Sequence, residues 1–331
     1  MEPEKFTYLI MTLDPVHVGT GGYRLGRVDN AIIREPGTNL PKIPGTSLHG
    51  SIQSAAALRC GNLKLAGQNK EGKPEDNPII YTFGSGEQGG FSSGVASIHD
   101  ARILLFPIAS QLGPVWITTA SILNDAGFSE VEGGKEDDKD KNSPVKAPSQ
   151  MEKVRLSKSV EHTDDTFAIG WLMLEVESKD VLLNAPSGGE RNSKAELKEA
   201  LSRTIIVHES LFSELVNSSL EVRTSVAINP ETGAAEDGAL FTYEAIPRAT
   251  FMTFDVVIND YRETNFPNSN SGDWKPKSPS EVVSDGLKLL EYLGVGGMNT
   301  RGFGRIKTIG EPIECSPVLE QTGGITKNDK S

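Results

Sequence analysis

The apolar positions of the chain form strand-like runs in some segments and helix-like spacing in others, without a regular order. Residues 6–13 are rich in β-branched and aromatic side chains, so they predict a buried strand that ends at Asp14 and Pro15. Residues 166–176 are the most continuous apolar run and predict a central strand. Further strands are predicted at residues 95–107, 115–120, 220–228, 240–246, 250–258 and 305–309, with short extended pieces at 28–34 and 205–207.

Helical spacing appears between these runs. Apolar residues recur every three or four positions from 282 to 293, which predicts an amphipathic helix capped by Ser280. Another helix follows the Pro-Gly turn at 44–45, is capped by Thr46 or Ser47, and runs to about residue 58. Shorter helices are predicted at residues 194–201 and 209–217.

Strands and helices interleave without the βαβ rhythm of a doubly wound parallel sheet, and hairpin-like connections are numerous. The predicted fold class is therefore α+β. One domain is predicted over residues 1–312, followed by a flexible tail at 313–331. Residues 61–94 are polar and glycine-rich, and residues 124–150 include a strongly acidic segment, so both predict long loops, although residues 78–83 are apolar enough to pack.

The composition argues against several broad classes of protein. The net charge is −12, which argues against a protein that coats free nucleic acid, although residues 130–140 contribute part of the acidity. Cys60 and Cys315 are far apart and form no zinc-binding pattern. No apolar run reaches the roughly 18 residues of a membrane span, and the acidic N-terminus does not resemble a signal peptide. The sequence therefore predicts a soluble cytoplasmic protein with no membrane partner.

Positive charge is concentrated near the N-terminus, in residues 15–59. This stretch has glycines at positions 19, 21, 22 and 26 and only two acids, Asp29 and Glu35. Its basic residues are Arg24, Arg27, Arg34, Lys42 and Arg59. Glycine lets the backbone approach a ligand closely, and the predicted helix after the Pro-Gly turn directs free N–H groups outward. This combination predicts a phosphate-bearing ligand.

A second glycine-rich loop spans residues 294–304 and carries Arg301, with Arg305 directly after it. Its spacing fails the dinucleotide fingerprint, because Asn299 stands where a glycine is required. It also fails the phosphate-loop pattern, because Phe303 stands where a lysine is required. A plain tight turn is the structural alternative. Because the first stretch has the same character, we prefer contact with a phosphate-bearing ligand. The glycines of this loop would expose backbone N–H groups, and its arginines supply forked guanidinium donors.

Both stretches resemble the RAMP superfamily of CRISPR-associated proteins. The motifs that carry the resemblance are VHVGTG, GRVDNAIIRE and IPGTSLHGSI near the start, and GVGGMNTRGFGRI near the end. Intermediate segments, including GVASIHDARILLFPI, GPVWITTASIL and SVAINPETGAAEDGALFTYEAIP, are similar to the repeated backbone subunit, the fourth subunit, of type III-B (Cmr) effectors. The backbone subunit of type III-A (Csm) effectors shares some motifs and is the alternative. The resemblance covers most of residues 6–309.

The resemblance implies a modified ferredoxin-like (RRM-like) palm with an inserted β-hairpin thumb at about residues 229–247. It implies an antiviral effector in which copies stack along a CRISPR RNA, together with other Cmr complex subunits. Such subunits cut the paired target RNA with an aspartate and a divalent metal. Asp29 occupies the position of that aspartate and is the possible metal ligand, with Mg²⁺ expected and Mn²⁺ as the alternative. His17 matches a family histidine and is a further candidate for catalysis or RNA contact.

The resemblance also places Thr242, Tyr243 and Glu244 in the thumb region, where the family has polar residues near the cut. His49 and Gln53 replace basic residues of the family, so the grip on the guide at this helix is expected to be weaker or to pass to Arg59 or the second glycine loop. The residues predicted to bind RNA are Arg24, Arg27, Arg34, Lys42, Ser47, His49, Arg59, Gly296, Gly297, Asn299, Thr300, Arg301 and Arg305.

One carboxylate is enough for the implied endoribonuclease chemistry. RNA carries its own nucleophile, the 2′-hydroxyl, and Mg²⁺ keeps several waters and needs few protein ligands. An aspartate in a loop, taken alone, is more often a turn or cap residue, so the role of Asp29 depends on the resemblance. Two alternatives stay open. One is a RAMP scaffold that binds guide RNA without cutting, and the other is a phosphometabolite enzyme that uses both glycine loops.

Overall fold

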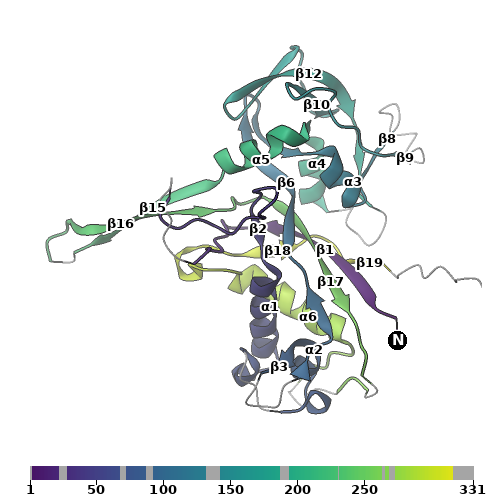
Figure 1. Cartoon of the computed structure of the whole chain (residues 1–331), viewed down its shortest axis with the longest axis vertical. Coiled ribbons are helices and arrows are strands. Elements are labelled where there is room, and N and C mark those ends of the chain that lie inside the picture. Colours follow the sequence, from purple (N-terminus) through teal and green to yellow (C-terminus); the bar gives the residue numbers. More distant parts are fainter. Residues whose placement is uncertain are drawn as a thin grey trace, which may run out of the picture.

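The computed structural model describes residues 2–21, 28–67, 72–86, 92–131, 142–186, 194–229, 231–262, 265–267 and 273–315. A mixed sheet of 12 strands runs through the molecule, with helices packed against it, so the fold class is α+β as the sequence predicts (Figure 1). The main path of the sheet is β11 (Thr166–Ile169), β12 (Leu172–Val181), β10 (Lys153–Ser157), β14 (Thr204–Val207), β7 (Gly113–Thr118), β6 (Ala101–Ser110), β17 (Phe251–Ile258), β1 (Glu4–Thr12) and β18 (Ile306–Thr308).

The strand predicted at residues 6–13 is the centre of one half of the sheet. β1 pairs antiparallel with β17, with Tyr8 opposite Phe254, and its other edge pairs with β18 and β19 (Ile313–Cys315). The predicted tail therefore starts too early, because residues 313–315 form a strand; residues 316–331 lie outside the described residues.

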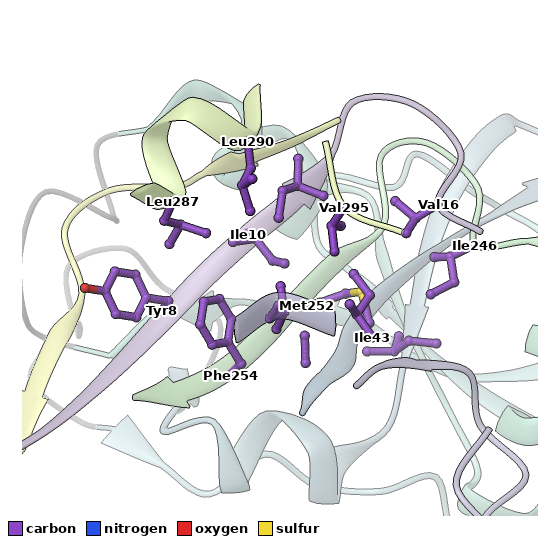
Figure 2. Close-up of a cluster of buried hydrophobic side chains, with 14 of the residues drawn as sticks. Tyr8, Ile10, Val16, Ile43, Ile246, Met252, Phe254, Leu287, Leu290 and Val295 are labelled. Carbon is purple, nitrogen blue, oxygen red and sulfur yellow. The ribbon is translucent and has the colours of Figure 1, made fainter. Parts of the chain in front are cut away.

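Two long helices cover this half of the sheet, α1 (Gly45–Arg59) and α6 (Pro279–Leu293). Figure 2 shows Leu287 and Leu290 of α6 in one apolar cluster with Ile10 of β1. The N-cap of α6 is Ser278, two residues before the predicted Ser280. The two helices approach closely at Gly286, where a Cβ would lie 2.5 Å from the carbonyl oxygen of Ile52.

The other half of the sheet carries α3 (Ala120–Asp125), α4 (Ala195–Ser202) and α5 (Glu209–Ser218). Here the prediction of one central strand at residues 166–176 is wrong. The chain turns between β11 and β12, which pair as an antiparallel hairpin, and β11 lies at the end of the main path. Gly170 in this turn has a φ of 57°, which residues with a side chain rarely adopt. The turn is hidden in the sequence because Trp171 continues the apolar run.

Both segments predicted as loops contain regular elements. Residues 78–83 form a buried helix, α2 (Pro78–Phe83), because the Asn77 side chain accepts hydrogen bonds from the first N–H groups. The described part of 124–150 contains β8 (Ser129–Val131) and β9 (Asn142–Ser143), which form a small sheet with β13 (Leu183–Asn184). The acidic residues 132–140 lie outside the described residues.

The shorter elements are β2 (Lys42–Ile43), η1 (Leu63–Leu65), η2 (Pro74–Asp76), β3 (Gly84–Ser85), β4 (Ser92–Ser93), β5 (Ala96–Ile98) and η7 (Asn299–Arg301).

A long hairpin projects from the body of the molecule (Figure 1). Its strands, β15 (Glu221–Ile228) and β16 (Ala235–Ala245), pair with each other and form a separate two-stranded sheet. The hairpin is longer than the segment predicted as the thumb, because all of β15 precedes residue 229. Within the described ranges, every helix is too short or too polar to span a membrane.

Candidate functional site

The N-terminal glycine stretch lies along β16, at the base of the hairpin. Asn30 forms a parallel bridge with Tyr243. The N–H of Asn30 donates to the Thr242 carbonyl at 3.0 Å, and the N–H of Glu244 donates to the Asn30 carbonyl at 3.1 Å. The stretch therefore adds to the free edge of β16, and this contact brings Asp29 to Thr242.

Thr242 holds the carboxylate of Asp29 by one oxygen. The Thr242 N–H donates to Asp29 Oδ2 at 2.7 Å, and the Thr242 hydroxyl donates to the same oxygen at 2.9 Å. These hydrogen bonds lower the pKa of Asp29 below its usual value, and the bond from the backbone N–H contributes more than the bond from the hydroxyl. Asp29 is therefore ionised at neutral pH, and its Oδ1 makes no hydrogen bond to another described residue.

Arg34 and Glu244 form an ion pair on the same face of β16 as Thr242. The Arg34 Nη2 donates to Glu244 Oε2 at 2.9 Å, and the side chain of Glu244 is only 9% exposed. The other guanidinium nitrogens of Arg34 donate to Asn217 Oδ1 at 2.8 Å and to the Ile32 carbonyl at 3.0 Å. Arg34 was predicted to bind RNA, but all three of its guanidinium nitrogens are used inside the protein.

His17 lies on the opposite face of β16, beside Tyr243. Its Nδ1 donates to the Glu244 carbonyl at 2.6 Å, which fixes the neutral ring as the Nδ1–H tautomer with Nε2 as an acceptor. The centres of the His17 and Tyr243 rings are 6.2 Å apart. Successive side chains of a strand point to opposite faces, so His17 and Asp29 flank β16 from different sides.

The second glycine loop closes over His17. Gly296 has a φ of 85°, and a Cβ there would lie 2.4 Å from the His17 carbonyl oxygen, so this approach requires glycine. The N–H of Gly297 donates to that oxygen at 2.8 Å. Asn299 donates from its side chain to the Leu293 carbonyl at 2.9 Å, so this side chain shapes the loop.

Aromatic residues join the second glycine loop to the hairpin. Phe303 of the loop contacts Tyr243 with ring centres 5.4 Å apart, and Arg223 of β15 lies 4.6 Å from the centre of the Phe303 ring. Arg301 is exposed, and its guanidinium lies 5.6 Å from the centre of the Phe241 ring. Arg301 and Asp29 thus lie at the base of the same hairpin, on its two faces. This aromatic cluster was not predicted from the sequence, although the alternation in residues 240–246 places two of its members, Phe241 and Tyr243, on one face.

A surface cleft of about 620 Å³ lies between α1 and the second glycine loop. Ser47, Gly296 and Asn299, all predicted to bind RNA, line this cleft. Thr46 and Ser51 add further hydroxyl groups from the exposed face of α1. Hydroxyl groups and glycine N–H groups suit the sugar-phosphate backbone of a nucleic acid. We call this the α1 cleft.

The start of α1 is less open to a ligand than the sequence predicts. Lys42 pairs with Asp100 at 2.5 Å, and Asp100 also accepts the Gly45 N–H at 2.8 Å. Burial opposes ionisation of Asp100, but the hydrogen bonds from Lys42 and Gly45 prevail and lower its pKa. A carboxylate of the protein itself therefore lies at the helix start and neutralises Lys42. Gln53 is buried and donates to two backbone carbonyls of the segment after α1.

The remaining predicted RNA contacts are dispersed. His49 packs edge-on against Phe83, with ring centres 5.2 Å apart. Arg59 is exposed at the far end of α1, about 20 Å along the helix axis from its start. Arg305 forms a two-point ion pair with Asp14, at 2.5 and 3.1 Å. Thr300 is exposed in the second glycine loop. Arg24 and Arg27 lie outside the described residues.

The residues around Asp29 could supply only one carboxylate ligand to a divalent metal. No group of three or more His, Cys, Asp or Glu residues with suitable geometry occurs within the described ranges. Asp29 is ionised, and among the described residues no other residue donates to its Oδ1, whereas Glu244 is paired with Arg34. This donor set suits a cation that keeps most of its waters, as Mg²⁺ does, and does not suit a site built wholly from protein ligands.

Comparison with known proteins identifies the family. The profile of the RAMP superfamily matches residues 9–307. The chain is 28% identical over 311 residues to the CRISPR system Cmr endoribonuclease Cmr4 of Pyrococcus furiosus, covering 90% of this chain and 92% of that protein. It is 38% identical over 305 residues to the CRISPR system Cms endoribonuclease Csm3 of Methanothermobacter thermautotrophicus, covering 92% of this chain and 82% of that protein.

Solved structures share the fold. Oligomeric Cmr4 from Pyrococcus furiosus matches with a TM-score of 0.59 at 19% identity, covering 96% of this chain and 100% of that chain. A chain of the type III-B Cmr-beta complex bound to cognate target RNA matches with a TM-score of 0.59 at 16% identity, covering 94% of this chain and 96% of that chain. The likeness extends over nearly the whole of each protein.

Proposed function

Because the chain belongs to the RAMP superfamily, we propose that it is a CRISPR RNA-binding backbone subunit that cuts guide-paired RNA at Asp29. A type III-B (Cmr) effector is favoured over the type III-A (Csm) counterpart, since the match covers 92% of the Cmr4 relative against 82% of the Csm3 relative. In this proposal copies stack along the guide together with other Cmr subunits. The body acts as an RRM-like palm and the β15–β16 hairpin as the thumb.

The observation that carries the proposal is that Thr242 donates hydrogen bonds to only one of the two carboxylate oxygens of Asp29. Both hydrogen bonds from Thr242 fall on Oδ2, so Thr242 leaves Oδ1 unoccupied and the carboxylate keeps its charge. A carboxylate with a lowered pKa is a poor proton acceptor, which favours an electrostatic role over that of general base. A bound Mg²⁺, or Mn²⁺ as the alternative, would supply positive charge at the scissile phosphate.

The α1 cleft and the second glycine loop support the binding role. Ser47 and the backbone of Gly296 face one cleft, and Arg301 extends a cation from the same loop. His17 offers Nε2 as a hydrogen-bond acceptor on the face of β16 that carries Tyr243. Asp29 lies on the other face, so His17 is better placed to contact a ribose hydroxyl than to take part in cleavage at Asp29. We therefore assign guide binding to the face of the hairpin base that carries Tyr243, and target cleavage to the face that carries Thr242.

The proposal is tested with the assembled complex and its bound RNA. The complex is expected to contain a small RNA, and labelled RNA complementary to that guide should be cut at regular intervals in the presence of Mg²⁺. Removal of the metal with EDTA should stop cutting but leave the target bound. RNA of unrelated sequence is the control. Guide-dependent binding without any cut would instead identify a catalytically silent RAMP scaffold.

A change of Thr242 to valine is expected to alter the pH dependence of cutting. Valine keeps the backbone N–H bond to Asp29 but removes the hydroxyl donor, so the pKa of Asp29 should rise toward its usual value. The ionised form is the active one, so activity is lost as pH falls through this pKa, and the loss should occur at a higher pH in the variant. Single-turnover cleavage measured against pH tests this, and Thr242→Ser should restore the original profile. An unchanged acid limb would show that Thr242 does not act through Asp29.

A further inference from the structure

Trp171 is a large aromatic side chain that is exposed but held in place. It lies in the turn between β11 and β12 and is 69% exposed. Its ring nitrogen Nε1 donates to the hydroxyl of Ser218, at the end of α5, at 3.2 Å. A fixed, exposed indole offers a flat surface on which a nucleobase can stack.

The indole forms one wall of a cleft of about 430 Å³ between the β11–β12 turn, α5 and the base of the hairpin. Its lining residues are Arg34, Asn39, Trp171, Glu214, Asn217, Ser218 and Glu244. We call it the Trp171 cleft. Glu244 is two residues from Thr242 on the same face of β16, which places them about 7 Å apart along the strand. The Trp171 cleft therefore lies about two strand residues from Thr242, which holds the Asp29 carboxylate.

The charge of the cleft selects against phosphate. Among the described residues that line it, the cation Arg34 is paired with Glu244, and Glu214 is an exposed acid on α5. The Glu214 side chain has carboxyl oxygens that accept hydrogen bonds, so it suits the amino and imino groups of a base edge. An aromatic wall with a nearby acceptor matches an unstacked base, with a preference for bases that carry an amino group.

The proposed cleavage chemistry requires such a base. Attack by a 2′-hydroxyl on the adjacent phosphate needs the attacking and leaving oxygens in line, and the regular stacked geometry of a paired strand does not provide this alignment. The nucleotide at the cut must therefore leave the stack. We infer that the Trp171 cleft takes the unstacked base of the target nucleotide beside the bond cut at Asp29, an inference that rests on the proposed function.

The test uses the guide-loaded complex and a target RNA with 2-aminopurine beside the cut and a single 2′-deoxy substitution that blocks cutting. Stacking on the indole should quench the 2-aminopurine fluorescence in the original complex. Trp171→Ala should raise the fluorescence several-fold and, with cleavable RNA, slow single-turnover cutting about tenfold. Trp171→Phe should restore most of both signals. Met173→Ala is the matched control, because Met173 is 66% exposed on the same hairpin and does not line the cleft.

Each result decides between the inference and its rivals. If Trp171→Ala leaves fluorescence and rate unchanged while Asp29→Asn stops cutting, the inference is wrong and the proposed function stands. If the original complex does not cut paired RNA, the proposed function itself fails. If Trp171→Ala lowers the number of copies per complex, measured by native mass spectrometry, with fluorescence unchanged, the cleft binds a partner protein instead of a base.

Discussion

Replacing Asp29 with asparagine is expected to slow target cleavage by about 100- to 1,000-fold while guide binding is retained. The amide has nearly the shape of the carboxylate and still accepts the Thr242 N–H, so the loop geometry should persist. The negative charge is lost, and removal of one electrostatic group aimed at the reacting centre has an effect of this size in other enzymes. Single-turnover cleavage of labelled target RNA, with the guide content of the complex measured in parallel, checks the prediction.

Asp14→Asn is the matched control for this change. Asp14 is another aspartate of the N-terminal segment, but its carboxylate pairs with Arg305, whose hydrogen bond lowers the pKa of Asp14. Loss of this surface pair should leave the cleavage rate nearly unchanged. Cutting at the original rate and spacing by Asp29→Asn would remove Asp29 from the catalytic proposal and direct attention to other residues at the hairpin base.

Arg34→Met is expected to lower the free energy of unfolding by about 3 to 5 kcal/mol. The change leaves the carboxylate of Glu244 buried without its cation, which is the costly way to break a buried ion pair. The hydrogen bonds from Arg34 to Asn217 and Ile32 are lost as well. Urea unfolding of the purified chain measures the effect. The added change Glu244→Gln should recover part of the loss, because it removes the unpaired charge.

Arg102→Met is the control for the loss of an arginine. Arg102 pairs with Glu35 at 2.9 Å, but its side chain is 73% exposed, so the change should cost less than about 1 kcal/mol. If Arg34→Met unfolds at the original urea concentration and instead weakens the salt dependence of RNA binding, Arg34 has the phosphate-binding role predicted from the sequence.

The sequence by itself determined the elements whose signals are local. The strand near residues 6–13 and the helices near 46–58 and 282–293 follow from apolar periodicity and turn residues, and the structure confirms them. The two glycine-rich stretches were also evident, and the resemblance that they carry is confirmed by the superfamily match over residues 9–307. Local signals failed where a single turn interrupts an apolar run, as at Gly170, and where a short cap creates a helix, as at Asn77.

Only the tertiary structure decided what each candidate side chain contacts. Asp29 and Thr242 are 213 positions apart, and Arg34 and Glu244 are 210 apart, yet each pair is in hydrogen-bond contact. Periodicity and spacing contain no information on such pairs, because they form only when the N-terminal stretch adds to the edge of β16. The same pairing that holds the Asp29 carboxylate by one oxygen withdraws Arg34 from the surface. The physical reason is that charge and hydrogen-bond donors are satisfied by whatever the fold brings close, so the role of a polar residue depends on its neighbours in space.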